Sequence, residues 1–509
     1  MGNDVRYHDA AVRLGEVLAE NDCTLYYGGG NVGLMKVIAD KMLEEGKEVV
    51  GVMPNLILDM EIGHDGVTKM IETDSMSERK NLLIDEKSTL IVNSGVFYIS
   101  DVFTNNGTLH FNSGTIDIAN LDGNGDIVIG GDVTTYKPLQ QQVEINEGAS
   151  LEISMDNLRK SNVVNNGTIW IYHGALDANL SELVKTYGKI GVTGVVTANA
   201  DWIDTDILNK GTLTLNQGTL NHSITGTGHL FIDNDMDINA PIVQKSIAIN
   251  QDKTLTASAD NLQVEQIANS GTLKLTGGQL SVKLPTWGEY ADNYGNISSR
   301  YTDGDVIIDG DVTLNAKVDQ AITINDGKSL TTSADDIAHI TVTNNGILNL
   351  TSGQIMSSFE GDGTVVISGD VSSTWFSNNN QKINIAESGI LTSGGFDAGK
   401  TFNINNQGIL KISDGYLQGN VNIIGGKTII DQDSSIQNIA NIGDIEMNGE
   451  WYVDDTTVTA SDVTLNGLIN ININDITQGS DIYAGGKLIA DSVTLGQNSQ
   501  LRLIIPAGG

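Results

Sequence analysis

The sequence predicts a mainly β fold, namely a right-handed parallel β-helix (solenoid) preceded by a small, incomplete α/β fragment. Three observations predict it. A twelve-residue pattern recurs six times after residue 100, and glycine is frequent (58 of 509 residues) whereas proline is scarce (5). Glycine suits tight turns between short strands, and proline would remove strand hydrogen bonds. The first ninety residues instead alternate helical and strand-like stretches, so we predict two domains, residues 1–87 and residues 88–509.

The N-terminal part predicts an α/β arrangement. Apolar residues recur at helical spacing over residues 5–20, which indicates an amphipathic helix. The elements expected after it are a strand at 24–27, a helix at about 32–45, a strand at 48–53, a strand at 67–73 and a helix at about 75–85. Such alternation is typical of parallel strands joined by helical crossovers.

A glycine-rich turn, Gly28, Gly29, Gly30 and Gly33, separates the first strand from the second helix. Glycines let backbone amides approach an oxyanion, and the positive end of the following helix points at the same place. The spacing fits neither the dinucleotide-binding fingerprint nor the P-loop. On the turn alone, a merely tight strand-to-helix connection explains it equally well.

Two motifs in the order "YYGGGNVGLMKVIADKMLEEGKEVVGVMPNLIL" and "SMSERKNLL" resemble the LOG family, also described as lysine-decarboxylase-like or cytokinin riboside 5'-monophosphate phosphoribohydrolases. The resemblance covers about residues 2–85. It implies a Rossmann-like fold, usually dimeric, that hydrolyses the N-glycosidic bond of a nucleoside 5'-monophosphate. It further implies that Gly28, Gly29, Gly30 and Gly33 line the phosphate and ribose pocket.

The second motif carries the implied reactive residues. Met76, Arg79 and Lys80 match the family's Met-x-x-Arg-Lys, which implies a catalytic role for Arg79 and substrate binding by Met76 and Lys80. A planar guanidinium also suits a phosphate group on chemical grounds. Without the resemblance, the charged residues of this motif would be interpreted as a solvated helix face.

The family pattern stops soon after Lys80. Its Pro-Gly-Gly-x-Gly-Thr-x-x-Glu motif, which holds phosphate and the second catalytic residue, does not occur in this sequence, and the family's opening strand is missing as well. Cleavage of a glycosidic bond develops positive charge that a carboxylate normally stabilises. Arg79 cannot do that, so we predict a truncated family fragment without phosphoribohydrolase activity.

From Ser88 onward the chain repeats a pattern of the form Asn-x-Gly-[Thr/Ile]-[Leu/Ile]-x-[Phe/Ile/Leu]-x-x-Gly-x-[Leu/Ile]. The copies begin at Asn105, Asn165, Asn209, Asn269, Asn344 and Asn406. Each unit alternates apolar and polar residues, and coils stacked about 4.8 Å apart bury a continuous apolar face that one unit cannot bury alone. A propeller is the rival architecture, but its period would be steadier than the observed intervals of 44 to 75 residues.

The pattern also predicts which side chains point inward. The expected inward ladder is Leu109, Phe111, Ile169, Ile171, Leu213, Leu215, Leu273, Leu275, Leu348, Leu350, Leu410 and Ile412. The asparagine that opens each copy is expected to serve the turn, either because asparagine tolerates the left-handed conformation or because its side chains stack between coils.

Residues 88–509 resemble the passenger domains of bacterial autotransporters and other surface adhesins, which implies an exported surface acting through binding or spacing. We therefore predict a non-enzymatic surface or secreted solenoid whose partner is an extracellular or host-surface ligand. The alternative is a nucleoside 5'-monophosphate phosphoribohydrolase carrying the solenoid as an appendage, with that nucleotide as a partner only if the N-terminal fragment functions. A third hypothesis treats the solenoid as a carbohydrate-active enzyme.

Composition and charge limit which kinds of partner and ligand we expect. A formal charge of −36 and a pI near 4.3 argue against nucleic acid, which needs clustered Lys and Arg. We predict no cofactor and no metal, since Asp233, Asp235 and Asp237 do not follow a calcium-loop spacing. No apolar run is long enough for a membrane span, and no secretory signal is present, so the sequence as written predicts a cytoplasmic location that conflicts with the surface character of the solenoid.

Overall fold

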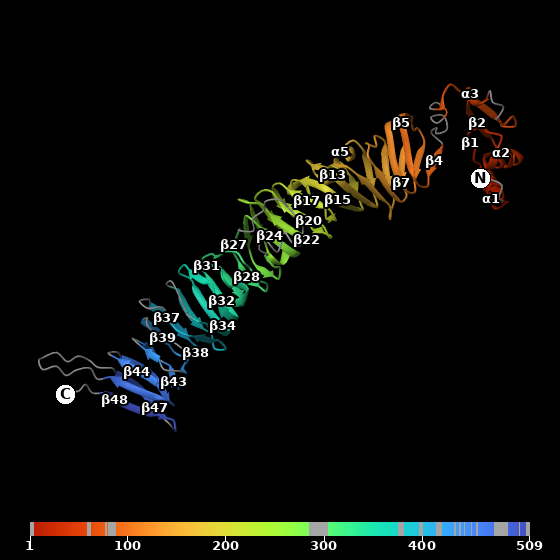
Figure 1. The fold of residues 1–509 in the computed structure, drawn as a ribbon. Coiled ribbons are helices and arrows are strands. Elements are labelled where there is room, and N and C mark those ends of the chain that lie inside the picture. The colour runs from red at the N-terminus through yellow and green to blue at the C-terminus, as the bar shows by residue number, and fades with distance from the viewer. Residues whose placement is uncertain are drawn as a thin grey trace. The chain divides into compact units, whose positions relative to one another are not determined.

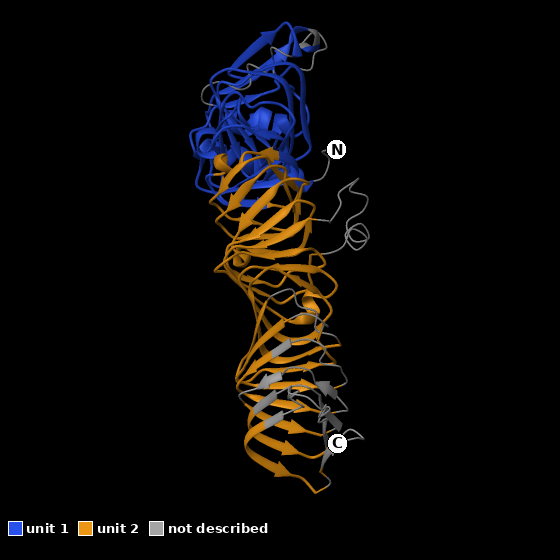
Figure 2. Ribbon diagram, turned by 90° about the vertical axis from the view of Figure 1, so that its left-hand side faces the viewer, with its two compact units in different colours: residues 1–196, 204–208 blue, residues 197–203, 209–509 orange. Residues whose placement is uncertain are grey.

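The computed structural model describes residues 5–58, 63–76, 79, 88–284, 304–374, 381–396, 401–413, 420–431, 434–436, 439–441, 443–448, 450–454, 457–472, 487–497 and 499–504. The chain forms two compact units, residues 1–196 with 204–208, and residues 197–203 with 209–509 (Figure 2). The predicted fold class is confirmed, because the protein is mainly β and builds a solenoid of about 19 turns from parallel strands. The predicted boundary at residues 87 and 88 adjoins residues 80–87, which lie outside the described residues.

The N-terminal segment of the first unit is the predicted α/β arrangement (red in Figure 1). Its strands pair in parallel in the order β1-β2-β3. The elements are α1 (Val5–Glu20), β1 (Leu25–Tyr27), α2 (Gly33–Glu44), β2 (Val49–Pro54), α3 (Asn55–Leu58) and β3 (Lys69–Thr73). Every residue of β2 is buried, as expected for a central parallel strand covered on both faces. The predicted helix at 75–85 falls largely outside the described residues.

Coils follow in the same unit, and they form two parallel sheets. The first sheet, in the order β14-β12-β10-β8-β6-β4, consists of β4 (Thr89–Val92), β6 (Thr108–Phe111), β8 (Asp126–Ile129), β10 (Gln142–Ile145), β12 (Asn162–Asn165) and β14 (Lys185–Thr186). The second contains β5 (Val96–Thr104), β7 (Gly114–Asp122), β9 (Asp132–Thr135), β11 (Ser150–Ile153) and β13 (Thr168–Leu176). Two short helices, α5 (Met155–Leu158) and α6 (Leu180–Leu183), lie in the connections. The division between the units runs through β15 (Lys189–Ala198) and β16 (Ile207–Asn209).

The second unit continues the same coil plan (Figure 1). Its first coils contain β17 (Thr212–Leu215), β18 (Gly218–Leu220), β19 (Ile224–Thr225), β20 (His229–Ile232), β21 (Met236–Ile238), β22 (Ile242–Ile249), β23 (Thr254–Ala257), β24 (Leu262–Asn269), β25 (Thr272–Leu275) and β26 (Gly278–Leu280). Its middle coils contain β27 (Asp305–Ile308), β28 (Asp311–Leu314), β29 (Ile322–Ile324), β30 (Ser329–Thr332), β31 (Thr341–Asn344), β32 (Ile347–Ile355), β33 (Ser358–Glu360), β34 (Thr364–Ser373), β35 (Lys382–Ile385) and β36 (Ile390–Ser393).

The last coils contain β37 (Thr401–Asn406), β38 (Ile409–Ile412), β39 (Asn420–Ile424), β40 (Lys427–Ile430), β41 (Ser434–Ile436), β42 (Ile439–Asn441), β43 (Asp444–Met447), β44 (Glu450–Asp454), β45 (Thr457–Leu465), β46 (Leu468–Asn472), β47 (Lys487–Leu495) and β48 (Gln500–Ile504). The longest run of paired strands in this unit extends from β26 to β47. All of its described pairings are parallel, for example β30 with β32 and β32 with β34.

The inward ladder is confirmed. All twelve predicted side chains are buried, and none exposes more than 3% of its surface. Equivalent residues of successive coils lie directly above one another, as Leu330, Leu348 and Val365 do in β30, β32 and β34. A period-two strand that repeats once per coil therefore builds a continuous apolar column, which is the main source of stability in a solenoid.

The repeat asparagines act differently from one of the two expectations. They are buried, and among the described residues positive φ angles outside glycine occur only at Asp22, Asp252 and His339, so left-handed conformation is not their role. Instead, Asn269 accepts a hydrogen bond at Oδ1 from the Gly271 amide (3.2 Å) and donates from Nδ2 to the Asp305 carbonyl of the next coil (2.9 Å). These side chains hold coils together because a buried amide must satisfy its donors and acceptors.

Short helical turns recur at one corner of the second unit, and the strand pattern of the sequence did not predict them. They are η1 (Ala200–Trp202), η2 (Ala259–Asn261) and η3 (Ala334–Ile337). The aspartate in each turn accepts a backbone amide of the next coil, as Asp260 Oδ1 does from Gln279 (2.9 Å). Gly278 precedes that amide with φ +86°, a left-handed conformation that glycine adopts without a steric penalty. Asp and Asn favour such turns because their side chains bond to nearby backbone groups.

Candidate functional site

The glycine-rich turn connects β1 to α2. Gly29 and Gly33 have φ angles of +72° and +67°, so the backbone there requires glycine. Gly30 forms an isolated antiparallel bridge with Gly63. Val32 occupies the N-cap of α2 and provides no side-chain acceptor. The first amides of α2 therefore face the turn without a side-chain cap, which is the arrangement that helix N-termini offer to anions.

Arg79 reaches the same turn from the "SMSERK" motif. Its Nε donates a hydrogen bond to the Val52 carbonyl oxygen of β2 (2.8 Å), and its Nη1 lies 3.7 Å from the Met76 sulfur. The guanidinium lies so close to Gly28 that a Cβ at residue 28 would collide with Nη2. The fold thus brings together Gly28, Met76 and Arg79, which the sequence could associate only through the family resemblance.

The remaining predicted site residues divide into two groups. Gly29, Gly30 and Gly33 lie in the turn, as described above, whereas Lys80 lies outside the described residues. Gly29 also packs closely against Met70, because a Cβ on Gly29 would approach the Met70 sulfur to 3.0 Å. The substrate-binding role of the glycines, Met76 and Lys80, and the catalytic role of Arg79, stay predictions.

A histidine–aspartate pair borders the turn, and sequence reasoning did not find it. The His64 backbone N–H donates to the Gly29 carbonyl (2.9 Å), and its Nδ1 accepts from the Gly66 N–H (3.0 Å). Since Nδ1 accepts, Nε2 carries the proton and donates to Asp40 Oδ1 at 2.7 Å. His64 is almost fully buried, so this pair fixes the turn against α2. A lone histidine and an aspartate 24 residues apart give no local signal of such pairing.

Asp40 lies in α2 beside this turn, and each of its carboxylate oxygens accepts a hydrogen bond. Oδ1 accepts from His64, and Oδ2 accepts from Lys36 Nζ at 2.6 Å. Burial raises the pKa of Asp40, but the hydrogen bonds from Lys36 and His64 and the positive charge of Lys36 outweigh it, so its pKa is lowered from the ordinary value. A carboxylate whose pKa is lowered in this way is a poor general base.

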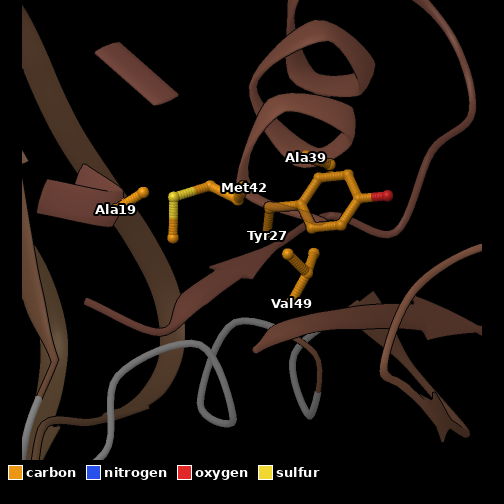
Figure 3. Packing of buried hydrophobic residues seen from close by; sticks show 5 residues of the cluster. All are labelled: Ala19, Tyr27, Ala39, Met42 and Val49. Atoms are coloured by element: carbon orange, nitrogen blue, oxygen red, sulfur yellow. The ribbon is translucent and has the colours of Figure 1, made fainter. Parts of the chain in front are cut away.

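Tyr27 ends β1 and lies in a small apolar cluster (Figure 3). Its neighbours there are Ala19, Ala39, Met42 and Val49. The phenolic oxygen is buried without a hydrogen-bond partner among the described residues. Burial, together with the nearby Asp40 carboxylate, raises the pKa of Tyr27 to about 12, so the phenol stays neutral. The cluster fixes β1 against α2, and with it the start of the glycine turn.

Chemically, the glycine turn has the Arg79 guanidinium and the uncapped start of α2 beside it. That set suits an oxyanion. In the described part of the chain, no group of three or more His, Cys, Asp and Glu side chains is arranged to hold a metal ion. The described helices also include none that is long and apolar enough to cross a membrane.

Comparison with known proteins supports the resemblance for this segment. A family model described as "Possible lysine decarboxylase" matches residues 35–97. Residues of this chain are 38% identical over 79 positions to the cytokinin riboside 5'-monophosphate phosphoribohydrolase LOG2 of Arabidopsis thaliana, which covers 16% of this chain and 37% of that protein. The LOG protein of Oryza sativa subsp. japonica is 37% identical over 79 residues, covering 16% and 33%.

A third relative, the probable phosphoribohydrolase LOGL9 of Oryza sativa subsp. japonica, is 40% identical over 74 residues, covering 14% of this chain and 33% of its own. The chain therefore spans between one third and two fifths of the length of these three relatives. The family match extends past residue 85, where the motif resemblance ends, and reaches residue 97, which lies in β5.

Proposed function

We propose that this chain is a non-enzymatic β-solenoid that acts as a binding or spacing protein at a cell surface or after secretion, in the manner of an adhesin or autotransporter passenger. The observation that carries the proposal is the parallel, in-register stack of coils. Its inward ladder buries the apolar side chains, so the outward rows of each sheet are free to vary and to make contacts. The proposed domain division is residues 1–87 and 88–509.

For the N-terminal segment, we propose that it keeps the phosphate-binding half of a LOG-type site without hydrolysing a nucleoside 5'-monophosphate. The support is the contact between Arg79 and Gly28 beside the start of α2. The relatives named above are phosphoribohydrolases, and this chain continues into coils where the family's Pro-Gly-Gly-x-Gly-Thr-x-x-Glu motif is expected. The carboxylate near the turn, Asp40, has a lowered pKa because it is hydrogen-bonded to Lys36 and His64, so it is a poor base.

The absence of hydrolysis is directly testable. The purified full chain, incubated with adenosine 5'-monophosphate and with its N6-isopentenyl derivative, is expected to release no free base above an enzyme-free control in liquid chromatography, because Arg79 alone cannot stabilise the developing positive charge. The second candidate function is the phosphoribohydrolase itself, which the Arg79 and Gly28 contact favours. Release of base by the wild type, lost in Arg79→Ala, would establish that candidate and overturn the first.

Nucleotide binding without turnover is the accompanying prediction. Arg79→Ala is expected to weaken binding of adenosine 5'-monophosphate by about ten- to a hundredfold in isothermal titration calorimetry, since a charged hydrogen bond contributes about 1.5–3 kcal/mol. Arg13→Ala is the matched control, because Arg13 lies on the exposed side of α1 and pairs with Glu16 at 3.1 Å. Equal affinities of the Arg79→Ala variant and the wild type would contradict the proposed phosphate site.

A further inference from the structure

The outer face of the second sheet of the first unit carries two neighbouring rows of side chains. In this sheet, Tyr98 aligns with Asp117, and Thr115, Thr134, Glu152 and Trp170 align with one another. We call Thr115, Thr134, Glu152 and Trp170 the acid row. Continuing the same register by one or two residues gives the aromatic row, which consists of Tyr98, Asp117, Tyr136, Ser154 and Tyr172.

The aromatic row crosses five successive coils. Tyr98, Asp117 and Tyr172 lie in β5, β7 and β13, whereas Tyr136 and Ser154 directly follow β9 and β11. Ser154 is buried and caps α5, so the three tyrosines and Asp117 form the accessible part of the row. Aromatic residues make up only 5% of this protein, so three tyrosines in one row, with a tryptophan beside them, are a local concentration. Tyr98 and Tyr136 expose 62% and 58% of their surface. Tyr136 and Tyr172 meet edge to face, with ring centroids 6.1 Å apart and planes at 72°. Exposed aromatic groups of this kind indicate a contact surface.

Trp170 lies across the backbone of the neighbouring strand. A Cβ at Gly191 in β15 would collide with its indole atoms Cζ3 and Cε3, and Gly191 is buried beneath the ring. Glycine at this position therefore lets the indole lie against the sheet. A ring held against the neighbouring strand in this way loses little conformational freedom when a ligand binds.

Glu152 is held in place within the acid row. Its Oε2 accepts a hydrogen bond from the Thr134 hydroxyl (3.2 Å), and its Oε1 accepts from the Thr193 hydroxyl (3.0 Å). A carboxylate oxygen has more than one acceptor position, so Glu152 can still accept a hydroxyl from a ligand. Asp117, between Tyr98 and Tyr136, offers a second half-exposed carboxylate.

We propose that these two rows form a binding site for a neutral glycan chain lying across the coils. The inference rests on the proposed function, since it names the ligand of a non-enzymatic solenoid. Sugar rings present C–H groups that the negative faces of aromatic rings attract, and sugar hydroxyls donate to carboxylates. Asp117, between Tyr98 and Tyr136, and Glu152 in the acid row supply carboxylate acceptors beside the rings.

Charge selects a neutral ligand over an acidic one. The rows contain two carboxylates, Asp117 and Glu152, and no Lys or Arg, and the whole chain carries a formal charge of −36. An acidic polysaccharide would be repelled by this field, whereas a neutral one donates hydroxyl hydrogen bonds to the carboxylates without a charge penalty.

Native affinity electrophoresis of the full chain tests the site. Gels containing hydroxyethylcellulose, xylan, galactomannan or dextran serve as neutral probes, and gels with polygalacturonate serve as the acidic probe. At least one neutral polymer is expected to retard the wild type, and polygalacturonate is not. Tyr136→Ala is expected to weaken that retardation by about tenfold in apparent Kd, the size of one lost aromatic contact. Retardation by no neutral polymer, or by polygalacturonate alone, would overturn the proposal.

Matched variants separate the site from general effects. Tyr187→Ala removes a tyrosine that is 71% exposed and lies outside both rows, and it is expected to keep wild-type retardation. Trp170→Ala removes the indole of the acid row. If that variant fails to fold, Trp170→Phe, which keeps an aromatic ring, takes its place. Equal losses in Tyr136→Ala and Tyr187→Ala would overturn the site. Size analysis of the incubated glycan reports separately on the proposed function. Shortening of the polymer would overturn a non-enzymatic solenoid. Retardation would still support the two rows as its binding site.

Discussion

Replacement of Asn105 by alanine is expected to destabilise the first unit by about 3 kcal/mol or more, because it leaves several buried polar groups without partners. Asn105 is fully buried, and its Nδ2 donates to the Gln141 side-chain oxygen (2.7 Å) and to the Asp126 carbonyl (3.2 Å). Its Oδ1 accepts from the Gly107 amide at 3.2 Å. Gln141 in turn donates to the Asn105 carbonyl (2.8 Å), so the two side chains clamp three successive coils.

Urea unfolding with hydrogen exchange of the local amides measures this loss. Hydrogen exchange is needed because long repeat arrays do not always unfold in one step. The control is Asn112→Ala, which removes an exposed asparagine hydrogen-bonded to Asn93 (2.8 Å) and is expected to change stability by about 0.5 kcal/mol or less. Similar losses in the two variants would show that the buried clamp contributes no more than a surface turn.

The same clamp recurs in the second unit, which makes the prediction general. Asparagine Nδ2 donates to a buried glutamine oxygen two coils onward in the pairs Asn209 and Gln244, Asn269 and Gln320, and Asn344 and Gln381, at 2.7, 3.0 and 3.2 Å. The two residues of a pair are 35, 51 and 37 residues apart in the sequence, because the loops between their coils differ in length. The repeat asparagine is therefore a structural residue.

Leu348→Ala is expected to cost about 2–5 kcal/mol, because it opens a cavity in the apolar column of the second unit. Leu348 is fully buried and lies between Leu330 and Val365 of the adjacent coils. Ile347, its neighbour in β32, points outward and exposes 44% of its surface. Ile347→Ala is thus the matched control, with an expected change of about 0.5 kcal/mol or less.

Thermal and urea unfolding of both variants, followed by circular dichroism, distinguishes them. A loss confined to Leu348→Ala would confirm that alternate residues of β32 face opposite sides, as period-two strands require. If Ile347→Ala were as destabilising as Leu348→Ala, the assignment of inward and outward faces in this coil would be wrong.

The coils were predictable because their information is local and repeated. A strand that alternates apolar and polar residues has only one face to bury, so the alternation alone places Leu109 and Leu410 inside, where both are fully buried. In the first ninety residues, α1, α2 and the strands β1, β2 and β3 were predictable from local pattern as well, whereas the one-turn helix α3 was not. The one-turn helices η1, η2 and η3 were not, since three or four residues carry no period and their stability comes from hydrogen bonds to the next coil.

By itself, the sequence determined the parallel solenoid, the inward ladder and the glycine turn, because each follows from residue type and spacing along a short stretch of chain. Only the tertiary structure decided which distant groups meet. It placed the Arg79 guanidinium against Gly28, paired His64 with Asp40, clamped four of the repeat asparagines to glutamines, and brought Tyr136, Tyr172 and Trp170 onto one face. Those contacts depend on loop lengths and on the register between coils, and neither is set by any local pattern.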